Sequence, residues 1–315
     1  MKVERNISLL AYNTFGIDVK AKLFIEYYSL DELRQILKEH RSERILHIGQ
    51  GSNLLFTKDF DGVILHSGMA RARFLDDETV EAQSGLRLDD LIAQLTDMCY
   101  CGMEKLSLIP GEVGASAVQN VGAYGVEAKD VIVRVNVLDV ETLEEKELTN
   151  AECRFGYRDS AFKHELKGKY IVTSVVYHVS KGDATKTREE IIETRNGKLP
   201  KVGEVGSAGS FFMNPFVSEE KAKALLSEYP DMPHFQSPMT NDQSPMIKIP
   251  AAWLIEQCGW KGKTMGGAQV WPKQALVIVN AGNATPKDIM DLAAAISASV
   301  KDKFGIDIHP EVNYI

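Results

Sequence analysis

Two glycine-rich stretches hold the residues best suited to bind a phosphate-bearing ligand. The first, GQGSN, follows the apolar run ILHI and supplies Gly49, Gly51, Ser52 and Asn53. Glycines let backbone N–H groups approach a pyrophosphate closely, and serine and asparagine add donors. The third glycine and opening helix of a Rossmann fingerprint are missing, as is the Gly-Lys-Ser/Thr of a Walker loop. A tight turn between two strands therefore explains the motif equally well.

The second stretch, LIPGEVGASAVQNVGAYGVE, favours a site for a flat aromatic ligand over an irregular surface loop. It has too many glycines for a stable helix or strand interior. Small side chains would let a ring lie on the main chain, and amide and phenol groups offer hydrogen bonds at its rim. A surface loop would not need the valines, which we expect to anchor the segment. The candidates are Pro110, Gly111, Gly114, Ala115, Ser116, Gln119, Asn120, Gly122 and Tyr124, with Val113, Val118 and Val121 as anchors.

The segment CRFGYRDSAFKHE contains one arginine of interest. Arg158 stands between an aromatic residue and an acid. It would make either a surface ion pair worth little or a planar fork aimed at a carboxylate. Lys163 and His164 after it are expected to be part of a solvated charged turn.

The stretch VGSAGSFFMNP raises the question of why small residues precede Ser210. One interpretation is a loop that enters a buried strand, with Phe211 and Phe212 in the core. The other is that Gly206 and Gly209 clear space, so that a substrate can reach the serine hydroxyl. The residues alone leave both open.

The charge balance limits the partners of the chain. A net charge of −8 and the absence of a basic run argue against a nucleic-acid protein. An anionic ligand therefore needs local cations, and TRNGKLPK offers Arg195 and Lys198. Glu311 follows a proline near the chain end, and its residue type alone does not single it out.

Length and composition predict a soluble chain of two or three domains, with 315 residues of which 44% are hydrophobic. No run is long and apolar enough for a signal peptide or a membrane span. The four cysteines include one Cys-x-Cys, which lacks the usual zinc spacing. We expect reduced thiols in a cytoplasmic protein, and no metal.

Apolar periodicity and turn residues predict an α+β chain with a helix-bearing third lobe. Strands are expected at residues 21–28, 44–48, 62–66, 170–179 and 274–280, with an antiparallel pair within 131–149. Helices are expected at 29–40 with a Ser29/Glu32 capping box, 88–102 with Gly102 as the stop, 187–197, 218–230, 251–259, and a last one bounded by Thr285, Pro286 and Gly305. Residues 181–186 are expected to be a linker.

The motifs, taken in order, resemble the UDP-N-acetylenolpyruvoylglucosamine reductase family. They are NTFGID, GQGSN, IPGEVGASAVQNVGAYG, CRFGYRDSAFKH, GSAGSFFMNP, GGAQVWPKQALVIVN and PEV, and they span Asn13–Val312. The resemblance implies a vanillyl-alcohol-oxidase/PCMH-type FAD-binding fold with an α+β substrate-binding domain. It implies FAD-binding subdomains at 1–66 and 67–198, a substrate-binding domain at 199–305, and a C-terminal segment, 306–315, that returns to the active site.

The resemblance also implies a cytoplasmic step of peptidoglycan synthesis. NADPH would reduce FAD, and flavin N5 would pass a hydride to the terminal enol carbon of UDP-N-acetylglucosamine enolpyruvate, which gives UDP-N-acetylmuramate. Ser210 would protonate the adjoining carbon, while Arg158 and Glu311 would stabilise the enolic intermediate. GQGSN and the Pro110–Gly125 stretch, including Ala123, would hold FAD with Arg195; Tyr124, Lys198, Asn214 and Gln274 would hold the nucleotide-sugar. We expect a monomer without nucleic-acid or membrane partners.

Two departures from the family pattern bear on the site. The longer form of the family carries a tyrosine-bearing loop that clamps the nucleotide, whereas only SKGDATK stands here. Many members read Pro-Glu-Val-Arg, whereas Asn313 occupies the arginine position, for which Lys261 or Lys263 would have to substitute. A flavin oxidase of the same fold, or a homologue that binds flavin or nucleotide without turnover, are the alternative hypotheses.

Overall fold

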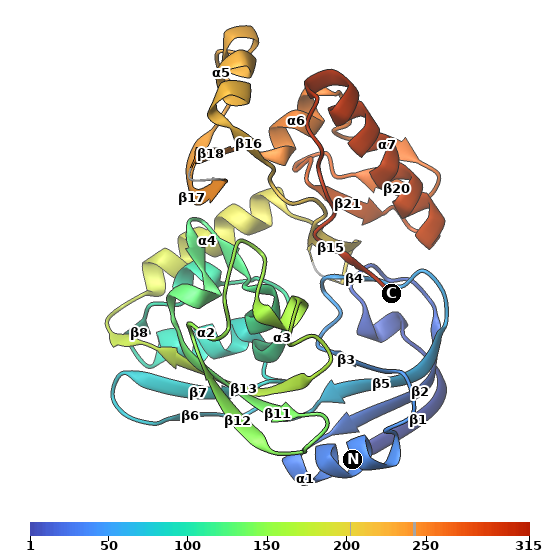
Figure 1. Cartoon of the computed structure of the whole chain (residues 1–315), viewed down its shortest axis with the longest axis vertical. Coiled ribbons are helices and arrows are strands. Elements are labelled where there is room, and N and C mark those ends of the chain that lie inside the picture. The colour runs from blue at the N-terminus through green and yellow to red at the C-terminus, as the bar shows by residue number, and fades with distance from the viewer. Residues whose placement is uncertain (202, 242–243) are drawn as a thin grey trace. The chain divides into compact units, whose positions relative to one another are not determined.

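The computed structural model describes residues 1–201, 203–241 and 244–315. Figure 1 shows the whole chain coloured by residue number. The chain divides into two compact units. The first contains Met1–Tyr12, Asp18–Gly51 and Asp59–Gly197, and the second contains Asn13–Ile17, Ser52–Lys58 and Lys198–Ile315. The boundary after Gly197 lies beside the expected start of the substrate-binding domain, while the expected boundary at residue 66 stays a prediction.

The first sheet of the first unit begins the chain, and α1 (Leu30–Glu39) covers it. Its strand order is β1 (Lys2–Ser8), β2 (Lys20–Tyr27), β5 (Phe60–Ser67) and β3 (Ile45–Ile48). β1 is antiparallel to β2, whereas β2 and β3 run parallel to β5. The helix buries Leu33, Ile36 and Leu37 against the sheet. The Ser29 hydroxyl accepts from the Glu32 N–H as expected, but the Glu32 carboxylate accepts from the Tyr28 N–H at 2.7 Å, so only the Ser29 half of the expected capping box forms. The predicted strands and helix of this region are confirmed.

The second sheet of the first unit is antiparallel and carries two helices. Its order is β12 (Glu145–Thr149), β11 (Ile132–Asp139), β13 (Tyr170–His178), β7 (Thr79–Gln83) and β6 (Ala72–Phe74). Smaller pairs are β8 (Tyr100–Cys101) with β14 (Ser180–Lys181) and β9 (Gly122–Ala123) with β10 (Val126–Glu127). Residues of α2 (Leu88–Asp97) and α3 (Val113–Gln119) share one apolar core with β7, β11 and β13. The antiparallel pair predicted within 131–149 is confirmed.

Two predicted boundaries in this unit are wrong. The helix expected at 88–102 ends at Asp97, because Cys99 takes a left-handed φ of 58° and the chain then enters β8. Tyr100 is buried there against the Phe74 ring, with centroids 4.7 Å apart, so packing ends the helix before Gly102. The expected linker 181–186 is also structured at both ends, since β14 includes Lys181 and α4 (Thr185–Lys198) begins at Thr185.

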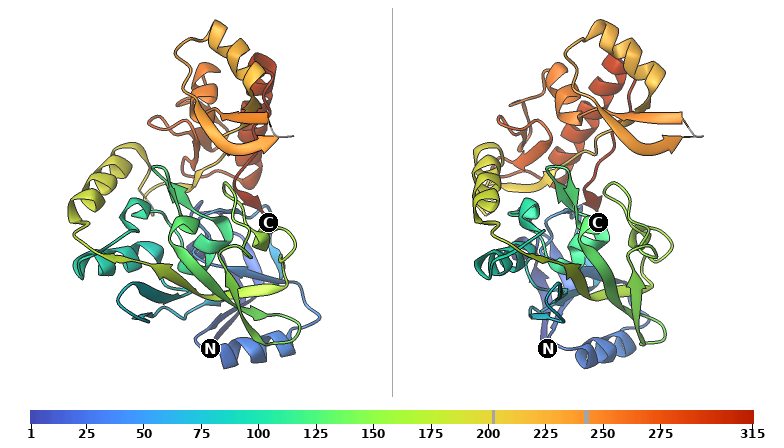
Figure 2. Two further views of the ribbon diagram at one scale, coloured as in Figure 1. Left: turned by 60° about the vertical axis from the view of Figure 1, so that its left-hand side comes forward. Right: turned by 90° about the vertical axis from the view of Figure 1, so that its left-hand side faces the viewer.

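The second unit contains two further sheets and the last helices, seen from two sides in Figure 2. One sheet has the order β15 (Gly206–Ser210), β21 (Val277–Asn280), β20 (Ala268–Val270) and β19 (Thr264–Met265). The other has β16 (Phe216–Ser218), β18 (Ser244–Lys248) and β17 (Phe235–Asn241) beside α5 (Glu219–Glu228). The last pair is β22 (Asn313–Tyr314) with β4 (Leu54–Leu55). α6 (Ala251–Gln257) and α7 (Pro286–Phe304) complete the unit.

The last helix begins and ends as predicted. Thr285 and Asp288 form a reciprocal capping box, Pro286 opens the first turn, and Gly305 stops the helix with a φ of 63°. No helix in the described ranges combines the length and apolar character needed to cross a bilayer.

Candidate active site

The two glycine-rich motifs meet in the first unit. The Gln50 side-chain carbonyl accepts the Gly111 N–H at 2.9 Å, which ties the Gly49–Gly51 turn to the start of α3. A Cβ placed on Gly49 would lie 3.3 Å from the Ala115 Cβ. Gly51 has a left-handed φ of 67°, which favours glycine. Gly49 thus packs closely against Ala115 and the Glu112 carboxylate, and the Gln50 side chain bridges the two motifs.

Residues 113–119 form a helix, so the prediction that this stretch is too glycine-rich for one is wrong. The Gly114 N–H donates to the Ser84 carbonyl at 2.9 Å, and a Cβ on Gly114 would lie only 2.8 Å from the Ser84 Cβ. Glycine at this position thus permits close packing of the helix. Val113 is fully buried, as expected of an anchor, whereas Ala115 is exposed. The Ser116 hydroxyl lies in the core, bonded to the Val113 carbonyl at 2.7 Å.

Gly114→Ala should lower the free energy of unfolding by about 1–3 kcal/mol, because the added methyl group overlaps Ser84 and forces the helix away. Gly197→Ala is the matched control, since Gly197 is also helical but nothing lies within 4 Å of its Cβ position. That change should be neutral or stabilising by up to about 1 kcal/mol. Urea unfolding measures both, and equal effects would contradict the packing explanation.

Arg158 is not a surface ion pair: its side chain is 16% exposed. Its Nη1 donates to the Glu127 carboxylate at 3.4 Å and to the Asn120 carbonyl at 3.5 Å, and its Nη2 donates to the Gly122 carbonyl. The guanidinium also lies over the Tyr157 ring, 5.1 Å from its centroid. The planar guanidinium of Arg158 therefore holds the loop after α3 in place through these contacts.

Asn120 completes this network. It takes a left-handed φ of 46° at the end of α3, and its side-chain amide donates to the Gly156 carbonyl at 2.7 Å and to Glu127 at 3.1 Å. The side-chain oxygen Oδ1 of Asn120 accepts the Lys129 N–H at 2.9 Å. Asn120 and Arg158 thus fix the candidate cofactor residues Gly122 and Ala123, which form β9.

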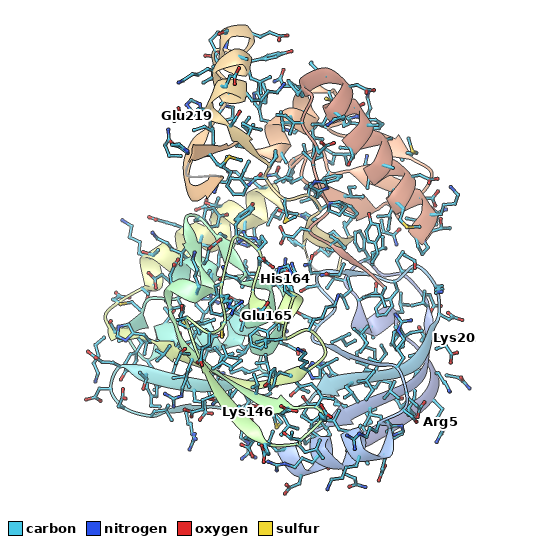
Figure 3. The ribbon with its side chains drawn as sticks, viewed as in Figure 1. Arg5, Lys20, Lys146, His164, Glu165 and Glu219 are labelled. Atoms are coloured by element: carbon cyan, nitrogen blue, oxygen red, sulfur yellow. The ribbon has the colours of Figure 1, made fainter. Side chains whose placement is uncertain are left out.

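Lys163 is placed differently from the prediction. It is half-buried and donates to the Gln119 side chain at 3.2 Å and to the Arg158 carbonyl at 2.8 Å, so it belongs to the candidate site rather than to a solvated turn. His164, labelled in Figure 3, is exposed and pairs with Asp159 at 2.8 Å, as expected.

Arg195 supplies the clearest sign of a missing hydrogen-bond acceptor. Among the described residues its Nε atom is buried without a partner. Burial lowers the pKa of Arg195, although Tyr124 and Asp89 act in the opposite direction. Tyr124 itself is exposed and has a left-handed φ of 52°. A buried donor of this kind needs an acceptor such as a phosphate or a flavin carbonyl, so the residues present fit FAD.

Ser210 and Glu311 lie on neighbouring segments of the second unit. Ser210 ends β15, is exposed and pairs with Val277. The Glu311 N–H donates to the carbonyl of Phe211, the next residue, at 2.8 Å. Phe211 and Phe212 are buried, as both interpretations of this stretch require.

The two glycines before Ser210 are needed for different reasons. Gly209 has a φ of 70°, and nothing lies within 4 Å of its Cβ position, so space is open beside the serine. A Cβ on Gly206 would instead lie 2.2 Å from the Phe15 carbonyl. Only Gly209 therefore fits the hypothesis of cleared space, and Gly206 serves packing.

The C-terminal segment contacts the second half of the GQGSN motif within the same unit. The Asn53 side chain donates to the Glu311 carbonyl at 3.3 Å, and the Asn313 N–H donates to the Asn53 carbonyl at 3.0 Å. Asn313 therefore holds Asn53, the last residue of the GQGSN motif. Lys261 pairs with Glu256 at 2.8 Å, and Lys263 lies over the Trp260 ring.

Trp271, which the sequence analysis passes over, connects two candidate substrate residues. Its indole N–H donates to the Lys198 carbonyl at 3.0 Å, and its carbonyl accepts the Gln274 N–H at 3.2 Å. The Asn214 side chain accepts the Ala251 N–H at 2.9 Å at the start of α6. In the sequence, the signal that could have singled out Trp271 is a tryptophan followed by a proline and two polar residues.

Comparison with known proteins shows which family the chain resembles. A family model described as an FAD binding domain matches residues 21–142, and the C-terminal domain of UDP-N-acetylenolpyruvoylglucosamine reductase matches residues 201–315. The reductase of that name from Bacteroides fragilis is 47% identical over 99% of this chain and 100% of its own. The Flavobacterium johnsoniae reductase is 40% identical over the full length of both chains.

The fold is shared with a solved structure. The crystal structure of UDP-N-acetylenolpyruvylglucosamine reductase from Thermus caldophilus superposes with a TM-score of 0.75 at 23% identity, covering 100% of this chain and 99% of that one. The expected α+β chain with a vanillyl-alcohol-oxidase/PCMH-type FAD-binding fold and FAD as cofactor is confirmed. The chain therefore belongs to the UDP-N-acetylenolpyruvoylglucosamine reductase family of FAD-binding oxidoreductases.

Proposed function

We propose that this chain reduces UDP-N-acetylglucosamine enolpyruvate to UDP-N-acetylmuramate in the cytoplasm, with NADPH as the hydride donor. Bound FAD would supply the redox chemistry, by accepting a hydride from NADPH and delivering it from N5 to the terminal enol carbon. The observation that carries the proposal is the exposed Ser210 hydroxyl beside open space, with the backbone of Glu311 bonded to the next residue. Full-length similarity to reductases of that name supports it.

In this proposal the chain divides the work as the resemblance implies. Subdomains 1–66 and 67–198 would hold FAD, domain 199–305 would bind the substrate, and segment 306–315 would bring Glu311 to the reacting group. The backbone of the Gly49–Gly51 turn and the exposed Ala115 would face the cofactor. The orphaned Arg195 Nε would gain an acceptor from the bound cofactor.

The reacting group would need a proton and a stabilised charge. Ser210 would donate its hydroxyl proton to the carbanion, a base strong enough to take it. Arg158 would place a buried positive charge near the developing enolate, and Glu311 would add a hydrogen bond. Because the Arg158 fork also binds Glu127 and Gly122, its charge is held in a fixed position.

The nucleotide-sugar would bind to the residues that the resemblance implies, which are Tyr124, Lys198, Asn214 and Gln274. Lys198 would offer the cation that an anionic diphosphate requires in a chain of net charge −8. Trp271 would position Lys198 through its ring N–H and Gln274 through its backbone carbonyl. Asn214 and Tyr124 would provide further polar contacts.

The test is an anaerobic two-step reaction with the purified flavoprotein. NADPH should bleach the oxidised flavin, and UDP-N-acetylglucosamine enolpyruvate should then restore its spectrum before air is admitted. NADH in place of NADPH measures the cofactor preference. A flavin that stays bleached until oxygen enters would favour a flavin oxidase, and a flavin that NADPH does not reduce would favour a homologue without turnover.

A further inference from the structure

A half-buried histidine, His66, lies between two glutamates, one of which contacts the Gly49–Gly51 turn, and the proposed reaction uses none of the three. His66 Nδ1 is 3.1 Å from Glu26 Oε1, and its Nε2 is 2.9 Å from Glu112 Oε1. The side chains of His66 and Glu112 are only 14% and 8% exposed. The three residues come from β5, β2 and the residue before α3.

The second oxygen of Glu112 reaches the turn itself. Glu112 Oε2 is 3.1 Å from the position that a Cβ on Gly49 would take, so glycine leaves room for the carboxylate. Glu112 also precedes the first residue of α3, and the neighbouring Gly111 is bonded to Gln50. A buried carboxylate at this place needs a positive partner, because an unpaired charge away from water is strongly destabilising.

The surroundings of His66 favour the charged form of that partner. Burial disfavours the imidazolium, but the hydrogen bonds and negative charges of Glu112 and Glu26 outweigh it and raise the pKa of His66. His47 on β3 opposes it only weakly, since burial lowers the pKa of His47 to about 4 and leaves that ring neutral. Tyr12 and Phe24 face the His66 ring, while Tyr28 and Lys2 act on Glu26.

We propose that protonated His66 is a positioning residue for FAD. It holds Glu112 against Gly49 and neutralises its charge, so that the Gly49–Gly51 turn can accept the cofactor's pyrophosphate. Loss of the proton leaves two carboxylates facing an imidazole that donates only one hydrogen bond, and adds negative charge beside an anion-binding turn. The inference rests on the proposed FAD site at this turn.

The dissociation constant of FAD, measured by flavin fluorescence with the apoprotein between about pH 6 and pH 9, tests the proposal. For the unaltered chain it should rise toward high pH. His66→Gln should weaken FAD binding about ten- to a hundredfold at low pH, as expected for losing a charge-assisted hydrogen bond, and should remove the pH dependence. His40→Gln is the matched control, because His40 pairs with Glu43 at 2.7 Å just after the end of α1. This variant should bind FAD as the unaltered chain does.

Glu112→Gln separates positioning from a general effect on folding. It removes the negative charge beside the turn, so FAD should bind more tightly than in the unaltered chain at high pH, and the pH dependence should disappear. A folded His66→Gln chain with unchanged FAD affinity and pH profile would overturn the proposal. If His66→Gln does not fold, the pH dependence of FAD binding by Glu112→Gln decides alone. A pH dependence like that of the unaltered chain would then overturn the proposal.

The outcome is independent of turnover. FAD binding with the expected pH profile but without reduction of the enolpyruvyl substrate would overturn the proposed function and leave this inference supported. Absence of FAD binding by the unaltered chain would overturn both.

Discussion

Ser210→Ala should leave the rate of flavin reduction by NADPH within about twofold of the unaltered rate, yet slow flavin reoxidation by the enolpyruvyl substrate about a thousandfold or more. This is the effect expected for losing a general acid, which typically contributes roughly 10²–10⁴-fold to a rate. The proton is needed only after hydride transfer to the substrate, so the two half-reactions should separate. Stopped-flow absorbance of the flavin, with each half-reaction started under anaerobic conditions, measures both rates.

Ser207→Ala is the control for this change. Ser207 lies on the same strand, and its N–H donates to the Thr14 carbonyl at 2.9 Å, a bond that alanine keeps. Both half-reactions should therefore proceed at the unaltered rate. Ser210→Cys retains a donor and should recover part of the lost rate. Equal slowing of the two half-reactions in Ser210→Ala would rule out Ser210 as the proton donor.

The sequence predicts well those elements whose ends are encoded locally. Thr285, Pro286, Asp288 and Gly305 lie within or next to the helix that they bound, and each interaction spans only a few residues. Predictions from the helix propensity of the residues were wrong where tertiary packing decides the structure. The helix at Val113–Gln119 contains Gly114, whose contact with Ser84 stabilises what glycine content alone would disfavour.

The candidate site follows the same division. Motifs name the residues, since Gly49, Arg158, Ser210 and Glu311 stand out by type or by resemblance, and the roles of these residues stay predictions. Their partners do not stand out, because Glu127 is 31 residues from Arg158 and the Trp271 ring reaches a carbonyl 73 residues away. Such pairs depend on how distant segments pack, and the same is true of Glu112 beside Gly49.

Arg158→Met is expected to slow reoxidation of the flavin by substrate about 10²–10³-fold at saturating FAD, the range for removing one group that stabilises developing charge. Reduction by NADPH should change little. Arg158→Lys should recover only part of the rate, because an ammonium keeps the charge but cannot bond to Glu127 and Gly122 in the planar geometry of the fork. The same stopped-flow experiment gives both rates, and a flavin titration shows how far the loop has loosened.

Arg154→Met tests whether this effect belongs to the site or to any arginine of the segment. Arg154 also has a left-handed φ, 44°, but its side chain is 73% exposed and pairs with Glu165, labelled in Figure 3, at 2.8 Å. A surface pair of this kind contributes little, so both half-reactions should be unaffected. If Arg154→Met and Arg158→Met slow reoxidation equally, or if Arg158→Met slows reduction as much as reoxidation, Arg158 orders the loop and does not act on the enolate. If only Arg158→Met slows the reaction, and only the reoxidation step, the Arg158 guanidinium must both order the loop and stabilise the enolate. The contacts that hold Gly122 also fix the position of the positive charge.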